Sequence, residues 1–287
     1  MSKDFDRDKP VSKQNCDAAT VTGFGYEWAA FPQDTLDPHE RQRIFNDYFR
    51  IFPWHALPDS PVGADIGCGS GRWAVLVAPR VGHLHLVDAS TESLKIAQHN
   101  LSKCPNCTFH NASVDGLPFN DASLDFAYSL GVLHHVPDPL AAIKSISDKL
   151  KPGAPFLVYL YYAFDNRPLW FRLLWSMSDV LRKLISRSLF PLRYTASQLL
   201  AFLVYWPLAK MGGVLYKFGL LSVNWPLAYY RDKSFNIMRT DALDRFGTRL
   251  ERRFTHEQIQ VILEQAGFVD IRFSGKPPYW CAVGIKQ

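Results

Sequence analysis

Three glycines at alternate positions follow a short apolar run at residues 62–66, which also contains an acidic residue. Glycines spaced in this way let a strand turn sharply into a helix and leave bare backbone for a ligand, which any side chain would block. About twenty residues further on, the apolar run 84–87 ends in Asp88. A glycine-rich turn followed at that distance by an acid indicates a nucleoside site, in which the acid accepts hydrogen bonds from ribose hydroxyls. The residues of the turn are Asp65, Gly67, Gly69 and Gly71.

The spacing of these glycines distinguishes between two kinds of nucleoside ligand. A dinucleotide site has the pattern G-x-G-x-x-G, in which the third glycine lets the helix pack closely on the strand. Here the pattern is D-x-G-x-G-x-G, which lacks that glycine and adds Asp65 before the turn. A carboxylate there repels a pyrophosphate and suits a ligand that carries an ammonium group. A simple strand–helix corner would explain the glycines, but not two acids at the carboxyl ends of strands, where α/β folds bind ligands.

This pattern closely resembles that of class I S-adenosylmethionine methyltransferases. Three later segments resemble the motifs of the ubiquinone/menaquinone-biosynthesis type, and with the turn they cover residues 62–162 in the right order and spacing: 117–119, 124–136 and 150–153. The resemblance implies that S-adenosyl-L-methionine is the cofactor. A dehydrogenase is disfavoured by the glycine spacing.

The resemblance also implies which residues contact the cofactor. Asp65 lies near the amino end of its methionine part, Asp88 binds the ribose, and Leu130 and Gly131 lie near the sulfonium. Ser113 stands where related enzymes carry an aspartate that contacts the adenine amino group. Either the Ser113 hydroxyl makes this contact, or Asp115 replaces the missing carboxylate. The remaining members of the set are Gly67, Cys68 and Gly69 in the turn, Ala89 on the rim beside the ribose acid, and Val114, which offers a backbone N–H.

Methyl transfer of this kind needs little acid–base chemistry. A methyl group on a sulfonium is already activated, so the protein has to position a nucleophile in line with it and exclude water. A base is needed only where the nucleophile must lose a proton. His134 and His135 are candidates because imidazole titrates near neutral pH, the alternative being that they pack or cap the following loop. Tyr161 is a third candidate, at the end of the fifth strand with Tyr162 and Asp165 beside it.

The alternation of strands and helices predicts an α/β fold with a doubly wound, mostly parallel, seven-stranded sheet of the Rossmann-like methyltransferase type. Its last strand is expected to be antiparallel, as the resemblance implies. We expect an N-terminal arm and cap helix at 1–50, a cofactor-binding domain at 51–162 and 254–287, and a helical insertion after the fifth strand at 163–253. The predicted strands are 62–66, 83–88, 107–110, 124–129, 155–161, 268–274 and 279–285, and the predicted helices are 38–50, 71–80, 90–101, 138–150 and 255–267. The aromatic cluster at 24–28 either packs as core or covers the cofactor.

The insertion is apolar and basic. Apolar residues recur at intervals of three and four from Trp170 to Ile185, which predicts an amphipathic helix with a basic polar face. The uncharged stretch 194–209 is shorter than the roughly 20 residues that span a bilayer, and Pro207 is expected to kink it. Residues 163–225 carry eight Lys or Arg and two Asp or Glu. Four interpretations stay open: a helical cap on the sheet domain, a lid over an apolar acceptor pocket, a peripheral anchor on anionic lipid, and a homodimer interface.

Composition excludes several other classes of protein. The net charge of +5 comes without a Lys/Arg run, so no nucleic-acid partner is expected. Five cysteines do not make a disulfide framework, and the pair Cys104 and Cys107 lacks a second ligand pair, so no metal site is expected. The charged residues 1–10 do not read as a signal peptide, which favours the cytoplasm.

Together these patterns predict an S-adenosylmethionine-dependent methyltransferase for a small or lipid-like acceptor, with O- or C-methylation favoured over N-methylation. The alternative is a non-catalytic cofactor-binding module whose insertion docks a partner or a membrane.

Overall fold

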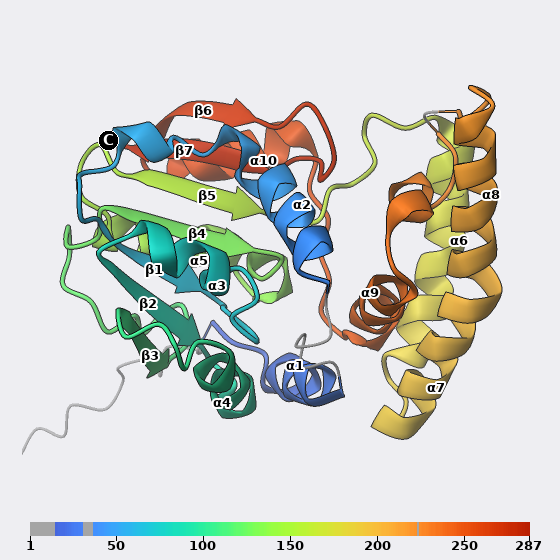
Figure 1. Ribbon diagram of the computed structural model, residues 1–287, viewed down its shortest axis with the longest axis horizontal. Coiled ribbons are helices and arrows are strands. Elements are labelled where there is room, and N and C mark those ends of the chain that lie inside the picture. Colours follow the sequence, from blue (N-terminus) through green and yellow to red (C-terminus); the bar gives the residue numbers. More distant parts are fainter. Residues whose placement is uncertain (1–14, 31–36, 223) are drawn as a thin grey trace, which may run out of the picture.

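A computed structural model describes residues 15–30, 37–222 and 224–287. Its centre is a seven-stranded sheet in the order β3-β2-β1-β4-β5-β7-β6, in which only β7 runs antiparallel to its neighbours (Figure 1). The predicted fold class is therefore confirmed. The strands are β1 Val62–Ile66, β2 His83–Asp88, β3 Cys107–Asn111, β4 Phe126–Leu130, β5 Pro155–Tyr159, β6 Phe268–Phe273 and β7 Ala282–Lys286.

Helices cover both faces of this sheet because alternate strand residues point to opposite sides. Phe126 and Tyr128 of β4 pack in the core beneath α2, α3 and α4, whereas Ala127 packs on the other face with α5 and α10. The helices of this part are α1 Ala18–Ala30, α2 Pro38–Tyr48, α3 Ala74–Val77, α4 Thr91–Asn100, α5 Pro139–Lys149 and α10 His256–Gln265. Short 3₁₀ turns lie at Phe49–Ile51, Trp54–Ala56, Ala78–Arg80, Leu133–His135 and Ala228–Asp232.

One predicted helix is shorter than expected. The segment 71–80 forms only one α-helical turn, α3, and then continues as a 3₁₀ turn to Arg80. Pro79 explains the change, because proline has no backbone N–H to donate to the preceding turn. The following strand β2 is unaffected, so the site at its carboxyl end keeps its position.

Between β5 and α10 the chain builds a helical layer that stands beside the sheet (Figure 1). It consists of α6 Leu169–Ile185, α7 Phe190–Leu200, α8 Trp206–Lys217 and α9 Phe235–Gly247. Helix α9 lies between the sheet domain and the outer helices, and it contacts α1, α6 and α7. The domain boundaries themselves stay a prediction, and residues 1–14 and 31–36 of the proposed N-terminal arm lie outside the described residues.

The expectation that the second insertion helix is too short to span a bilayer is wrong. Helices α7 and α8 are joined by a π-helical turn, Ala201–Tyr205, and form one continuous helix of 28 residues, Phe190–Lys217. Pro207 stands in the first turn of α8, just after the wider π turn, where a proline ring is accommodated. Among the described residues this is the helix that is long and apolar enough to cross a membrane.

Candidate active site

The glycine turn after β1 has the backbone geometry that its sequence predicts. Gly67, Gly69 and Gly71 all have positive φ angles, of 76°, 54° and 72°, a region that favours glycine. The backbone N–H groups of Gly67 and Cys68 donate to the Val87 carbonyl at 2.7 and 3.0 Å. A Cβ on Gly67 would lie 2.4 Å from Val132 Cγ1, so the turn is also packed tightly from behind.

Asp88 at the end of β2 joins this turn to the next helix. Its Oδ2 accepts a hydrogen bond from the Gly69 N–H at 2.8 Å, and its Oδ1 accepts one from the Ser90 N–H at 2.8 Å. Burial raises the pKa of this carboxyl, and the two backbone donors act against the rise. Because each carboxylate oxygen has a further lone pair, Asp88 can hold the turn and still accept from the hydroxyls of a ribose.

Asp65 is buried at the end of β1 and accepts a hydrogen bond from the Tyr128 hydroxyl at 2.9 Å. Burial raises its pKa to about 8, although the tyrosine bond lowers it. The group is therefore mostly protonated at neutral pH in the ligand-free chain, and a cation placed beside it would favour the ionised form.

Ser113, Val114 and Asp115 are predicted to contact the adenine of the cofactor, and the structure places one of the three away from the cavity. Ser113 and Val114 line a cavity together with Asp88 and Ala89. Asp115 does not line it; its carboxylate accepts a short hydrogen bond from Ser113 Oγ and one from the Asn15 N–H at 3.1 Å. Burial acts to raise the pKa of Asp115, but these two donors outweigh it and lower the pKa. Asp115 therefore positions Ser113 rather than taking the place of the missing carboxylate.

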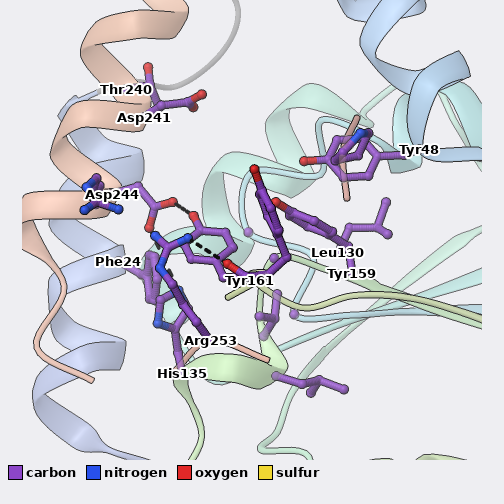
Figure 2. Close-up of a pocket in the computed structure, with 18 of the residues that line it drawn as sticks. Phe24, Tyr48, Leu130, His135, Tyr159, Tyr161, Thr240, Asp241, Asp244 and Arg253 are labelled. Atoms are coloured by element: carbon purple, nitrogen blue, oxygen red, sulfur yellow. Dashed lines mark hydrogen bonds and ion pairs between the residues drawn. The ribbon is translucent and has the colours of Figure 1, made fainter. Parts of the chain in front are cut away.

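That cavity has a volume of about 600 Å³ and extends from the glycine turn to the insertion, a size typical of small-molecule sites. Figure 2 shows Leu130 and Tyr159 on the sheet side and Asp241 and Asp244 of α9 on the other. The predicted cofactor residues on its wall are Asp65, Gly67, Cys68, Gly69, Asp88, Ala89, Ser113, Val114, Leu130 and Gly131.

Of the two predicted histidines only His135 lines the cavity. Its Nδ1 lies 2.6 Å from the Leu250 carbonyl oxygen, which can only accept, so Nδ1 carries the proton. Its Nε2 faces Asp244 Oδ1 at 3.9 Å. Burial lowers the pKa of His135 to about 4, so the ring is neutral at neutral pH. Phe24, from the predicted aromatic cluster, packs edge-on against this ring at 5.0 Å.

His134 corrects the prediction that it is a candidate base. Its side chain is fully buried and stacks on the Tyr161 ring, with centroids 3.8 Å apart. It does not line the cavity, and burial holds its pKa well below the ordinary value. His134 therefore packs beneath Tyr161, and the packing alternative describes it correctly.

Tyr161 does line the cavity, and its hydroxyl donates a short hydrogen bond to Asp244 Oδ2 (Figure 2). Burial, and then the adjacent carboxylate, raise the pKa of Tyr161 well above its ordinary value, so it stays protonated and acts as a donor. Burial raises the pKa of Asp244 to about 6, and the Tyr161 bond opposes the rise.

Sequence reasoning missed the two carboxylates of α9. Asp241 accepts from the Tyr230 hydroxyl at 2.9 Å, and burial raises its pKa to about 6. Asp241 and Asp244 are one turn apart on a helix whose buried positions are otherwise apolar except for Thr240: Ile237, Met238, Ala242, Leu243 and Phe246. Two acids three residues apart in such a helix lie on one face, and this spacing was the signal available in the sequence.

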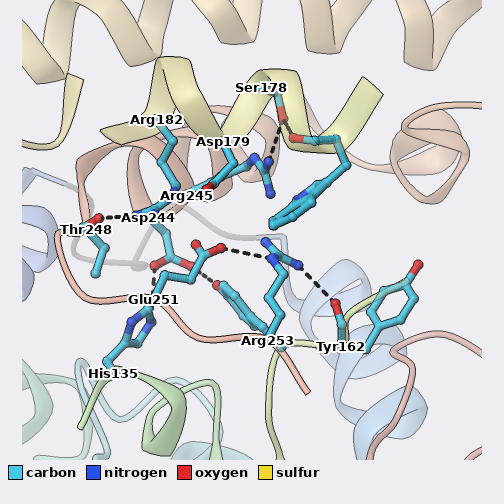
Figure 3. Close-up of polar contacts among 12 residues, drawn as sticks. His135, Tyr162, Ser178, Asp179, Arg182, Asp244, Arg245, Thr248, Glu251 and Arg253 are labelled. Carbon is cyan, nitrogen blue, oxygen red and sulfur yellow. Dashed lines mark hydrogen bonds and ion pairs between the residues drawn. The ribbon is translucent and has the colours of Figure 1, made fainter. Parts of the chain in front are cut away.

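A polar network fixes this end of the cavity (Figure 3). Arg253 Nε contacts Glu251 Oε1 at 2.9 Å, and its guanidinium lies 5.0 Å from the centre of the Tyr161 ring. Arg182 of α6 donates to the Thr248 carbonyl at 3.0 Å, and Arg245 of α9 donates to Ser178 Oγ at 2.7 Å. These buried polar contacts hold α6 to α9 and to the segment that follows α9. No group of three or more potential metal ligands occurs among the described residues.

Comparisons with known proteins agree with this architecture. Residues 64–158 match the family model of a methyltransferase domain. A ubiquinone biosynthesis O-methyltransferase of Paracidovorax citrulli is 32% identical over 106 residues, 36% of this chain and 43% of that protein. Phosphoethanolamine N-methyltransferase 2 of Caenorhabditis elegans is 34% identical over 149 residues, 50% of this chain and 32% of that protein. The matches thus span less than half the length of these relatives.

Among solved structures, the phosphoethanolamine N-methyltransferase 2 of Haemonchus contortus, in complex with phosphomonomethylethanolamine and S-adenosylhomocysteine, aligns with a TM-score of 0.50. The alignment covers 89% of this chain and 43% of that one at 19% identity, which shows a shared fold. Fold, turn and family model together define a class I S-adenosylmethionine-dependent methyltransferase domain. Within that class, the domain is similar to the ubiquinone-biosynthesis type.

Proposed function

We propose that the protein transfers a methyl group from S-adenosylmethionine to a hydroxyl group of a small, largely apolar acceptor. The observation that carries this proposal is that one cavity joins the glycine turn and Asp88 to the carboxylates of α9. A donor bound at the first end and an acceptor bound at the second are then held in a single enclosed space, which is what an in-line transfer requires.

The chain's own residues fit the cofactor. Asp88 accepts from the ribose hydroxyls, the turn at Gly67 and Gly69 gives close backbone approach, and Asp65 faces the ammonium group. When bound, S-adenosylmethionine supplies a methyl group that its sulfonium has already activated. Leu130 and Gly131, at the end of β4, lie on the same wall of the cavity.

The acceptor end provides a base for a hydroxyl nucleophile. Asp244 has a pKa near 6 and is therefore mostly ionised at neutral pH, where it can accept the proton that the hydroxyl loses. The Tyr161 hydroxyl donates to this carboxylate and orients it. Tyr48, Tyr159 and Phe24 line the space beside it and keep water away from the reacting atoms.

Several relatives favour oxygen as the methylated atom. The Paracidovorax citrulli protein and "O-methyltransferase rstn1" of Aspergillus nomiae are O-methyltransferases by name, and the latter is 34% identical over 94 residues. The Caenorhabditis elegans relative is an N-methyltransferase by name. Two carboxylates with raised pKa values suit a nucleophile that must be deprotonated, which supports oxygen over a free amine.

The proposal is tested in two stages. Titration calorimetry with S-adenosylmethionine is expected to show binding that Asp88→Ala weakens about a hundredfold, by loss of charge-assisted hydrogen bonds. Asp121→Ala is the matched control, because this carboxylate is exposed and does not line the cavity, and the affinity of this variant should not change. Equal affinity of both variants would contradict the assignment of the ribose site.

Formation of S-adenosylhomocysteine is then measured with 4-hexylphenol, 4-hexylcatechol and phosphoethanolamine as acceptors. Turnover with a hydroxyl acceptor is the expected result. Turnover with phosphoethanolamine alone would assign the enzyme to N-methylation. Tight cofactor binding without turnover on any of the three would favour a cofactor-binding module.

A further inference from the structure

The outer helices of the insertion carry an extended set of exposed apolar side chains. On α6 they recur at intervals of three and four and form one stripe, which predicts a single apolar face: Leu169, Trp170, Leu173, Leu174, Met177, Val180, Leu181 and Leu184. The long helix α7–α8, which lies beside α6 in Figure 1, exposes Leu199, Phe202, Leu203, Val204, Trp206, Met211 and Val214, and the exposed Phe218 follows its last residue. These two sets are called the apolar face below. Soluble monomers seldom expose so many large apolar residues together.

The charges around the apolar face are almost all basic. Between Leu169 and Lys217 the exposed charged residues are Arg172, Lys183, Arg187, Lys210 and Lys217. The single acidic residue of this segment, Asp179, is neutralised by Arg182 at 2.6 Å and Lys183 at 3.0 Å. An apolar surface with a basic margin is complementary to a membrane that contains anionic lipid, since each basic residue near such a surface contributes about 1 kcal/mol of attraction.

The helix α7–α8 lies on the protein along its whole length and does not stand free. At about 1.5 Å per residue its 28 residues extend over about 42 Å. Its inner side is covered, because Ser197, Ala201, Tyr205, Ala209 and Gly212 are buried, the first four facing α9 and its surroundings. Crossing a bilayer would expose that inner side to lipid, so the geometry favours a helix that lies in the interface.

The cavity reaches the apolar face. Leu174 of α6 and Val204 of the long helix both line the cavity, yet they are 49% and 39% exposed. Trp175 and Leu208 line it just inside them. The acceptor end of the cavity is therefore walled, on the side away from the sheet, by residues that also belong to the apolar face.

We propose that the apolar face inserts into the interfacial layer of an anionic membrane and that an apolar acceptor passes from the lipid into the cavity between Leu174 and Val204. The protein would then act at the cytoplasmic leaflet, where anionic lipids are concentrated. The route for the acceptor rests on the proposed function, whereas the docking of the apolar face does not.

Flotation with vesicles tests the docking. The full chain is mixed at low salt with vesicles of phosphatidylcholine alone or with added phosphatidylglycerol, and it is expected to float only with the second. Leu173→Glu and Met177→Glu, at positions 66% and 72% exposed that do not line the cavity, should lower the bound fraction at least tenfold. Val261→Glu on α10, 42% exposed and far from the apolar face in the fold, is the matched control and should float like the native chain.

Three outcomes would overturn the docking: no flotation of the native chain, equal flotation of all variants, or a homodimer in light scattering that Met177→Glu dissociates. The last result would assign the apolar face to a second copy of this chain. Calorimetry with S-adenosylmethionine is run on the same variants and should give unchanged affinity. Failure of cofactor binding would contradict the proposed function, while failure of flotation alone would contradict only the docking.

Binding of 4-hexylphenol, measured by calorimetry on the cofactor-loaded protein, tests the route. Leu174→Arg and Val204→Arg place charges at the proposed opening and should weaken binding at least tenfold. Leu184→Arg is the control, because this residue is on the same face but does not line the cavity. Absence of binding to the native chain, or equal binding by all three variants, would overturn the route.

Discussion

The hydroxyl of Tyr161, two residues beyond the end of β5, donates a hydrogen bond to Asp244 of α9, 83 residues further along the chain. The first residue follows the strand that ends beside the cofactor site, and the second belongs to the insertion. This contact brings the insertion into the chemistry: it places a carboxylate with a raised pKa on the wall of the cavity that the glycine turn also lines.

Replacing Asp244 by Asn should reduce kcat for a hydroxyl acceptor by about a hundredfold, the usual contribution of a general base. The substitution keeps the shape of the side chain, so S-adenosylmethionine affinity should not change. Asp121→Asn, at an exposed position, is the control and should retain full activity. The rate of S-adenosylhomocysteine formation is measured for each variant. Full activity of Asp244→Asn would show that Asp244 is not the base.

The pH dependence of the same reaction follows from the pKa of Asp244. The carboxylate form is the active one, and burial raises its pKa to about 6. Activity should therefore rise as the pH increases through about 6 and then level off. Asp241 has a similar pKa, so the profile of Asp241→Asn is the necessary comparison: it should keep the rise, whereas the residual activity of Asp244→Asn should lose it. A profile that is flat between pH 5 and 8 in the native enzyme would contradict this assignment.

Because the pKa of Asp65 is raised in the free protein, we expect cofactor binding to release a proton. Burial raises its pKa to about 8 in the free protein, so the group is mostly protonated at neutral pH. The ammonium group of the cofactor favours the carboxylate form and lowers that pKa, hence affinity should increase as the pH rises toward 8. Calorimetry at neutral pH in phosphate and in Tris should give different heats for the native chain and equal heats for Asp65→Asn. Equal heats for the native chain would show that Asp65 does not change its charge.

The cofactor end could be predicted from the sequence because its signals are local. The alternate glycines set their own backbone angles, and Asp65 and Asp88 are placed by the carboxyl ends of neighbouring parallel strands. The acceptor end could not be predicted in the same way. Asp241 and Asp244 reach the cavity only because α9 packs between the sheet domain and the outer helices, which is a matter of tertiary packing.

Two local predictions also failed for reasons of packing. His134 and His135 are neighbours with the same side chain, yet the 3₁₀ turn that holds them directs one beneath Tyr161 and the other to the cavity wall. The uncharged stretch around Pro207 suggested a helix too short to span a bilayer, but the π turn before Pro207 lets the helix continue for 28 residues.

Gly67→Ala should destabilise the chain through both strain and a clash. Its φ of 76° costs a residue with a side chain about 1 kcal/mol, and the new Cβ would meet Val132 at 2.4 Å. The total loss in the free energy of unfolding should be about 3 kcal/mol. Gly153→Ala is a matched control, since Gly153 has a φ of 82° but open space around its Cβ position. Denaturant unfolding should show a loss of about 1 kcal/mol there, and equal losses for the two variants would show that Val132 gives way.

Glu40 links α2 to α9 and provides a test of how α9 is held in place. Its buried carboxylate accepts a hydrogen bond from the Ser234 N–H at 2.7 Å, and Ser234 is the N-cap residue of α9. Glu40→Ala leaves this backbone donor without its acceptor, which should cost about 1–3 kcal/mol of stability. Because α9 carries Asp241 and Asp244 but no residue of the cofactor end, kcat with a hydroxyl acceptor should fall while S-adenosylmethionine affinity stays within about twofold. Glu257→Ala, an exposed position on α10, is the control. Equal losses of activity and of cofactor affinity in Glu40→Ala would mean that the two ends of the cavity are not held independently.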